Sequence, residues 1–110
     1  MLDQSALDLL FNNARTQAAW LDKKVDPALL QQVYDLAKMC PSAANSQPLR
    51  ITFVTSKEGK EKLKPALDEG NIAKTMAAPV TAIIATDMEF YENLPKLFPR
   101  VDARIWFVGN

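Results

Sequence analysis

The stretch Pro41-Ser42-Ala43-Ala44-Asn45-Ser46-Gln47-Pro48 decides how the rest of this sequence is interpreted. Each proline fixes its own φ at about −65° and moves the preceding residue out of the α region. Between the prolines lie hydroxyl and amide side chains, which both donate and accept hydrogen bonds. A stiff polar loop suits a planar ligand rich in nitrogen and oxygen, although the same residue types are common in ordinary connecting loops.

The segments on either side of this loop have clear local patterns. Asp26 and Pro27 predict the start of a helix over 27–40, because aspartate caps helices and proline suits the first helical position. β-Branched and aromatic residues over 50–55 predict a strand. Apolar residues at helical spacing predict one buried stripe on the helix, formed by Leu29, Val33, Leu36 and Ala37.

Weaker signals mark the other elements. We expect Trp20 to anchor the core and Cys40 to be a buried structural thiol. The segment 80–86 is nearly continuous in apolar and β-branched residues, which predicts a strand buried on both faces. The remaining expectations are a first helix capped by Asp3 and ending at Asn12-Asn13, a solvated lysine-rich helix with Thr55 and Glu58 as its capping box, a break at Pro65, a helix over 72–78 ended by Pro79, a helical turn over 90–94, an irregular link between Pro95 and Pro99, and a last helix capped by Asp102.

Composition limits the possible functions. The chain has 110 residues, 48% hydrophobic, with 13 basic and 13 acidic side chains, so no net field attracts nucleic acid. No apolar run is long enough to span a membrane and the start lacks a signal-peptide pattern, so we expect a cytoplasmic location. With no histidine and one cysteine, the usual zinc sites, the serine triad and an internal disulfide are excluded, and we expect no metal. Any chemistry therefore needs a cofactor rather than a catalytic side chain.

Two predicted strands do not make an independent sheet. Either another chain completes the sheet, or these residues form the front part of a longer fold. The sequence has no repeat and no obvious linker, so we expect a single domain over 1–110.

Three places in the sequence resemble the nitroreductase family. They are Arg15-Thr16 followed by Trp20, the loop over 41–48, and the pair Asn71 and Lys74. The resemblance implies an α+β nitroreductase-like fold, a central sheet flanked by helices, of which this chain holds only the N-terminal portion. It also implies FMN as cofactor, NADPH or NADH as electron donor, and an intertwined homodimer.

The resemblance assigns a cofactor-binding role to nine residues. Arg15 meets the FMN phosphate, and the Thr16 hydroxyl lies near the flavin. Asn71 and Lys74 approach the pyrimidine edge of the ring from one helical face. The loop contributes the other five: Pro41, Ser42, Ala43, Asn45 and Gln47, of which Gln47 lies at the subunit junction.

Longer stretches resemble the malonic semialdehyde reductase branch of the family. They include 60–67, 70–82 and 89–99. This branch implies reduction of 3-oxopropanoate to 3-hydroxypropanoate in pyrimidine degradation. Two alternatives stay open: a broad nitroreductase or quinone reductase, and a truncated, non-catalytic fragment that dimerises. Ala18 and Leu49 depart from the family pattern, and its late basic residues have no counterpart before Asn110.

Overall fold

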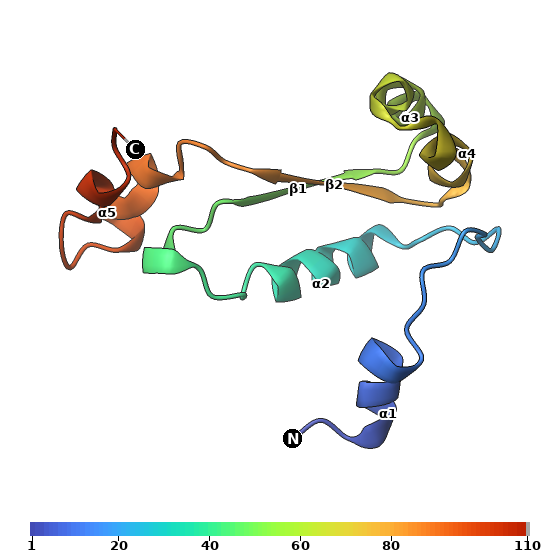
Figure 1. Cartoon of the computed structure of the whole chain (residues 1–110), viewed down its shortest axis with the longest axis horizontal. Coiled ribbons are helices and arrows are strands. Elements are labelled where there is room, and N and C mark those ends of the chain that lie inside the picture. Colours follow the sequence, from blue (N-terminus) through green and yellow to red (C-terminus); the bar gives the residue numbers. More distant parts are fainter. Residues whose placement is uncertain (110) are drawn as a thin grey trace.

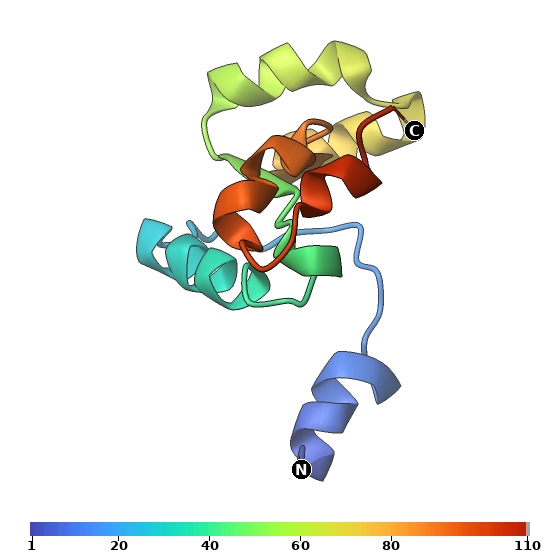
Figure 2. The same ribbon diagram turned by 90° about the vertical axis from the view of Figure 1, so that its left-hand side faces the viewer.

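A computed structural model describes residues 1–109 of the chain. Two strands form a long ribbon at the centre, helices lie near both of its ends, and the N-terminal helix stands apart (Figures 1 and 2). The elements in chain order are α1 (Gln4–Leu7), a π-helical turn (Asp8–Asn12), α2 (Pro27–Ala37), a 3₁₀ turn (Ala43–Asn45), β1 (Leu49–Val54), α3 (Lys57–Leu63), a 3₁₀ turn (Lys64–Ala66), α4 (Glu69–Ala77), β2 (Thr81–Thr86), a 3₁₀ turn (Phe90–Asn93), α5 (Leu94–Leu97) and a 3₁₀ turn (Ala103–Trp106).

The ribbon pairs β1 with β2 in antiparallel register. Leu49 lies opposite Thr86 at one end, and Val54 lies opposite Thr81 at the other. The prediction that the second strand is buried on both faces is wrong, because Ile84 keeps 63% of its surface exposed. A continuous apolar run indicates a strand that other elements cover on both faces. Among the described residues, β2 has only β1 as a neighbouring strand.

Helix α2 begins as the sequence predicts. The Asp26 carboxylate accepts a hydrogen bond from the Ala28 amide at 2.8 Å, and Pro27 occupies the first turn. The expected buried stripe is wrong, since Leu29, Val33 and Leu36 are all exposed, Leu36 to 77%. A helix buries its apolar face only where another element covers it, and no described element packs closely over this stripe.

Local capping was predicted better than burial elsewhere in the chain. Asp3 caps α1, and Asn13 follows the end of the π-helical turn, as expected. The cap of α3 is Ser56, whose Oγ accepts from the Gly59 amide at 3.1 Å, so the assignment of Thr55 was wrong by one residue. The expected solvated lysine face of α3 is also partly wrong, because Lys60 is only 5% exposed.

The C-terminal turns form a small packed cluster. Leu94 is fully buried and Ala103 nearly so, and the rings of Phe90 and Phe107 meet edge to face with centroids 4.9 Å apart. Pro95 lies in the first turn of α5, so the irregular link predicted from that residue was wrong. Asp102 precedes the last turn, but its side chain makes no capping hydrogen bond.

The chain as a whole is open. Its radius of gyration is 18.1 Å, against about 13 Å for a compact domain of this length. Its accessible surface is 9013 Å², whereas a compact monomer of this mass has roughly 6,100 Å². Trp20 and Cys40, both predicted to be buried, are exposed for the same reason.

Candidate functional site

The loop over 41–48 folds back on itself through its own hydrogen bonds. The Ser42 hydroxyl oxygen accepts from the Gln47 amide at 3.1 Å, and the Ser42 carbonyl accepts from the Asn45 amide at 3.0 Å. Ala44, Asn45 and Gln47 all have left-handed backbones, with φ of 50°, 51° and 49°. Residues other than glycine adopt this backbone conformation only when their surroundings impose it.

The amide side chains of the loop are already engaged. Asn45 donates through Nδ2 to the Leu97 carbonyl at 3.1 Å, and its Oδ1 accepts from Gln47 Nε2 at 2.7 Å. Ser46, between them, is buried. The contact with Leu97 ties the loop to α5, which lies 52 residues later in the sequence and could not be predicted from local pattern.

A hollow of about 350 Å³ lies at the other end of the ribbon, between the N-terminal segment, α4 and β2. It brings together Thr16 and Lys74, two of the predicted site residues. Trp20 joins the N-terminal segment to α4, because its indole Nε1 donates a hydrogen bond to the Lys74 carbonyl oxygen at 2.8 Å. The full lining is Thr16, Gln17, Trp20, Lys74, Thr75, Ala78, Val80, Thr81 and Ala82.

Thr81, one of the residues that line this hollow, has a hydroxyl without a partner. Thr81 Oγ1 is buried and makes no hydrogen bond within the described part of the chain. A buried hydroxyl without a partner is unfavourable, so Thr81 lowers the stability of the described chain. Thr81 could not be singled out from the sequence, because a threonine in an apolar strand gives no local signal of being unpaired.

Arg15 and Asn71 neighbour residues of the hollow along the chain, but they do not line it. Arg15 is exposed and donates through Nη1 to the carbonyls of Asn12 and Ala14, at 3.1 and 2.6 Å. Asn71 lies one helical turn before Lys74 on α4 and is half-buried. The spacing on α4 that the sequence predicts is therefore present.

The predicted residues thus form two groups at opposite ends of the ribbon (Figure 1). The loop leads into Leu49, and α4 leads to Thr81, which pairs with the far end of β1. Five residue steps along a strand separate these ends by roughly 17 Å. Within one chain, the loop and the hollow are therefore separate sites.

Two further observations describe what residues 1–109 lack. They contain no group of three or more metal-ligating side chains. No helix among them is both long and apolar enough to cross a membrane.

Comparison with protein families identifies the chain. The model of the family described as "Nitroreductase family" matches residues 14–99. This range includes all nine predicted site residues. The chain belongs to the nitroreductase family.

Curated nitroreductase relatives match almost the whole chain. A protein from Burkholderia lata is 61% identical over 109 residues, which is 99% of this chain and 56% of the relative. One from Stenotrophomonas maltophilia strain K279a is 63% identical over 108 residues, 98% of this chain and 55% of the relative. Both are named "Putative NADH dehydrogenase/NAD(P)H nitroreductase". The chain spans about half the length of these relatives.

Solved structures of the nitroreductase family share its fold. A protein from Streptococcus pneumoniae aligns with a TM-score of 0.64 and 29% identity, over 71% of this chain and 38% of that one. A second, from Exiguobacterium sibiricum and described as a putative nitroreductase in complex with FMN, aligns with a TM-score of 0.61 and 27% identity, over 66% and 34%. The predicted α+β nitroreductase-like fold is confirmed, as part of a domain with a small antiparallel sheet.

Proposed function

We propose that this chain is the N-terminal portion of one FMN-dependent NAD(P)H oxidoreductase domain. Its family membership supports this proposal, as do the names of its relatives and the FMN complex of one structural neighbour. The observation that carries it is the hollow that Thr16 and Lys74 both line. A hydroxyl and a cation in one hollow fit an anionic, heteroatom-rich cofactor such as FMN.

We propose that the complete site needs two copies of the chain. The loop over 41–48 and the hollow lie at opposite ends of one ribbon, so a single copy cannot close them around one ligand. In a homodimer, the loop of one copy can cover the hollow of the other. Ser42 and Asn45 would then hold the ring, with the backbone of Pro41 and Ala43 against it and Gln47 at the junction.

The side chains at the hollow have distinct proposed roles. Lys74 stabilises negative charge at the pyrimidine edge, and Asn71 donates to the same edge from the preceding helical turn. Arg15 binds the phosphate with its forked donors, and Thr16 binds nearby through its hydroxyl. FMN, when bound, supplies hydride transfer between NAD(P)H and the substrate. No side chain of the chain is proposed to act as a nucleophile.

The proposed substrate is a small aldehyde, 3-oxopropanoate. Its reduction to 3-hydroxypropanoate takes two electrons and one proton from NAD(P)H and a second proton from solvent. The resemblance of 60–67, 70–82 and 89–99 to the malonic semialdehyde reductase branch supports this choice. The shared name of the relatives favours the alternative, a broader nitroreductase or quinone reductase.

The visible spectrum tests the cofactor. After incubation with FMN and removal of free flavin, the proposed function requires a yellow protein that NADPH or NADH bleaches without oxygen. A colourless protein would instead support the third possibility, a non-catalytic fragment that only dimerises. Turnover rates on 3-oxopropanoate against those on nitroaromatics and quinones then separate the two enzyme proposals.

Lys74→Ala tests the named cation. We expect flavin affinity to fall about tenfold while the unfolding midpoint changes little, because a half-buried lysine contributes more to an anionic ligand than to folding. Flavin titration and urea denaturation measure the two effects. Lys57→Ala, an exposed lysine on α3, is the matched control and should leave both unchanged. Unaltered flavin affinity in the Lys74 variant removes this residue from the site.

A further inference from the structure

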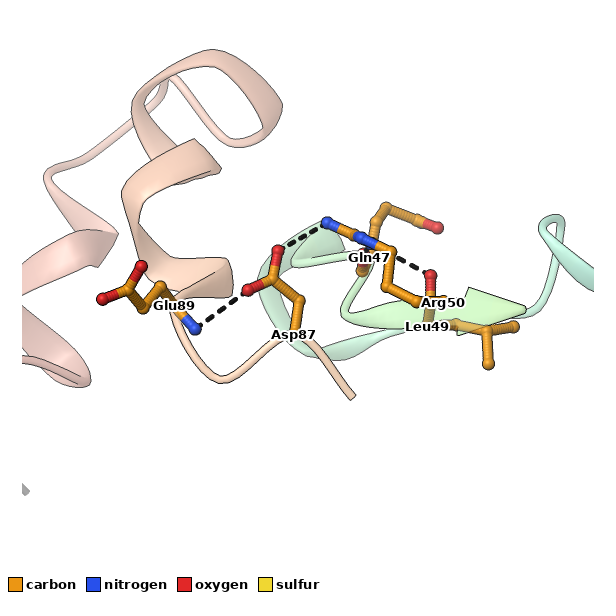
Figure 3. Close-up of polar contacts among 5 residues, drawn as sticks. All are labelled: Gln47, Leu49, Arg50, Asp87 and Glu89. Carbon is orange, nitrogen blue, oxygen red and sulfur yellow. Dashed lines mark hydrogen bonds and ion pairs between the residues drawn. The ribbon is translucent and has the colours of Figure 1, made fainter. Parts of the chain in front are cut away.

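Arg50 joins the loop over 41–48 to both strands. Its Nη1 donates to the carbonyl oxygens of Gln47 and Leu49, each at 2.9 Å, and its Nη2 donates to Asp87 Oδ2 at 2.6 Å (Figure 3). The guanidinium thus connects the end of the loop, the start of β1 and the residue after β2. Only arginine presents several donors in one rigid plane for such a connection.

Asp87 is itself held in place on two sides. Its Oδ1 accepts from the Glu89 amide at 3.0 Å, and its own amide donates to the Pro48 carbonyl at 2.8 Å. The Pro48 contact continues the antiparallel ladder one step beyond Leu49 and Thr86. Asp87 therefore offers Arg50 a carboxylate whose position is fixed by backbone, not by a flexible surface chain.

The carbonyl that Arg50 holds belongs to a residue with an unfavourable backbone. Gln47 has φ of 49° and is followed by Pro48, which restricts it further. Such a conformation persists only where neighbouring contacts impose it. Two contacts do so here: the Gln47 amide donates to Ser42 Oγ, and its carbonyl accepts from Arg50.

We propose that Arg50, oriented by Asp87, is a positioning residue that fixes the left-handed backbone at Gln47 and thereby sets the loop over 41–48 in its flavin-binding shape. This inference rests on the proposed function for its ligand, and on the described contacts alone for its effect on the loop. Arg50 acts through the loop and needs no contact with the cofactor. A preset loop binds more tightly because less ordering is required on binding.

The first measurement needs no flavin. Backbone amide exchange is compared in the parent chain, Arg50→Met, Arg50→Lys and Asp87→Asn, with the exposed Arg100→Met as the matched control. We expect the Gln47 amide to exchange about tenfold faster in Arg50→Met, with partial rescue in Arg50→Lys, while the amides between β1 and β2 keep their protection. Unchanged exchange at Gln47 overturns the inference. Loss of strand protection in Arg50→Met transfers the decision to Asp87→Asn, which retains an acceptor for the Glu89 amide.

The second measurement is FMN affinity, from quenching of flavin fluorescence. We expect the Kd to rise about tenfold in Arg50→Met and less in Asp87→Asn, with Arg100→Met equal to the parent. Faster loop exchange with an unchanged Kd overturns the link to binding. A parent chain that does not bind FMN overturns the proposed function and the flavin half of this inference, and the exchange data still decide the loop half.

Discussion

Thr81 shows how much a single side-chain oxygen reveals at the scale of the residue. Thr81 lines the hollow beside α4, but its hydroxyl oxygen is buried, and no residue within 1–109 bonds to it. Leaving a hydroxyl buried and unpaired costs about 1–3 kcal/mol. The strand nonetheless keeps a threonine at this position, where valine would have nearly the same shape.

Thr81→Val should therefore stabilise the free chain, by about 1 kcal/mol, because it removes a polar atom that has no partner. Urea denaturation of the flavin-free protein measures this effect. Thr52→Val, at an exposed position of β1, is the control and should change stability very little. A destabilised Thr81 variant would show that the hydroxyl is bonded in solution after all.

Residue-level prediction from sequence worked where the signal was local, as in the Asp3 and Asp26 caps. The resemblance gave Thr16 and Lys74 flavin-binding roles that stay predictions, and the structure places both residues at one hollow. That Asn45 donates to the Leu97 carbonyl could not be predicted, because the partner depends on the tertiary fold. Arg50 and Asp87 were missed for the same reason: they are 37 residues apart and meet only through the strand register.

At the scale of the element, two helical glycines offer a matched comparison. A Cβ at Gly59 of α3 would lie 2.8 Å from Val54 Cγ1 and 3.1 Å from the capping Ser56 Oγ, whereas a Cβ at Gly70 of α4 would meet nothing within 4 Å. Gly59→Ala should destabilise the chain by about 1–2 kcal/mol through overpacking. Gly70→Ala should stabilise it by about 0.5 kcal/mol through reduced backbone entropy.

Denaturation midpoints of the two glycine variants provide the test. The expected signs are opposite, although both changes raise intrinsic helix propensity. A gain of stability in both variants would mean that propensity outweighs the contact between α3 and the end of β1.

The C-terminal cluster should loosen in acid. Arg104 donates through Nε and Nη2 to the two carboxylate oxygens of Glu92, at 2.9 and 2.6 Å, and these bonds lower the pKa of Glu92 from its ordinary 4.5. Because the folded pKa lies below the unfolded one, the stabilising contribution is complete above pH 4.5 and is lost as the pH falls below it.

Trp106 fluorescence in a Trp20→Phe background follows this acid transition. Glu92→Gln should abolish the pH-dependent part of the cluster's stability and leave the cluster weaker at neutral pH. An identical acid transition in both proteins would contradict the role of the pair.

Elements were predictable from sequence where their limits depend on neighbouring residues. Asp26 with Pro27 and the break before Pro79 are examples, because capping and proline act within one turn. The burial of α2 and β2 was not predictable, because it depends on what covers each face. The apolar residues whose spacing predicted burial are exposed in both elements.

At the scale of the whole molecule, the chain has more surface than a compact monomer of its mass. The excess over that expectation is roughly 2,900 Å², and it includes the exposed apolar side chains of α2, β2 and the last turn. This excess is larger than the roughly 1,000–2,500 Å² that each partner usually buries in an obligate interface. We therefore expect other polypeptide to cover these apolar faces.

We accordingly expect the chain to be associated in solution, because exposed apolar area drives assembly. Sedimentation velocity should show at least two copies per particle. High salt should not dissociate them, since the exposed faces are apolar and not charged. A monomer that unfolds in one sharp cooperative transition would contradict this expectation.

The length of the two-stranded ribbon sets the distance between the loop over 41–48 and the hollow at α4. Six residue pairs fix this length, and it does not depend on which side chains the strands carry. Exchanging one β-branched residue for another leaves that length intact, whereas adding two residues to each strand would move the ends apart by roughly 7 Å. Engineering of this scaffold can exchange strand residues other than Arg50 and Thr81, but the number of paired residues must stay the same.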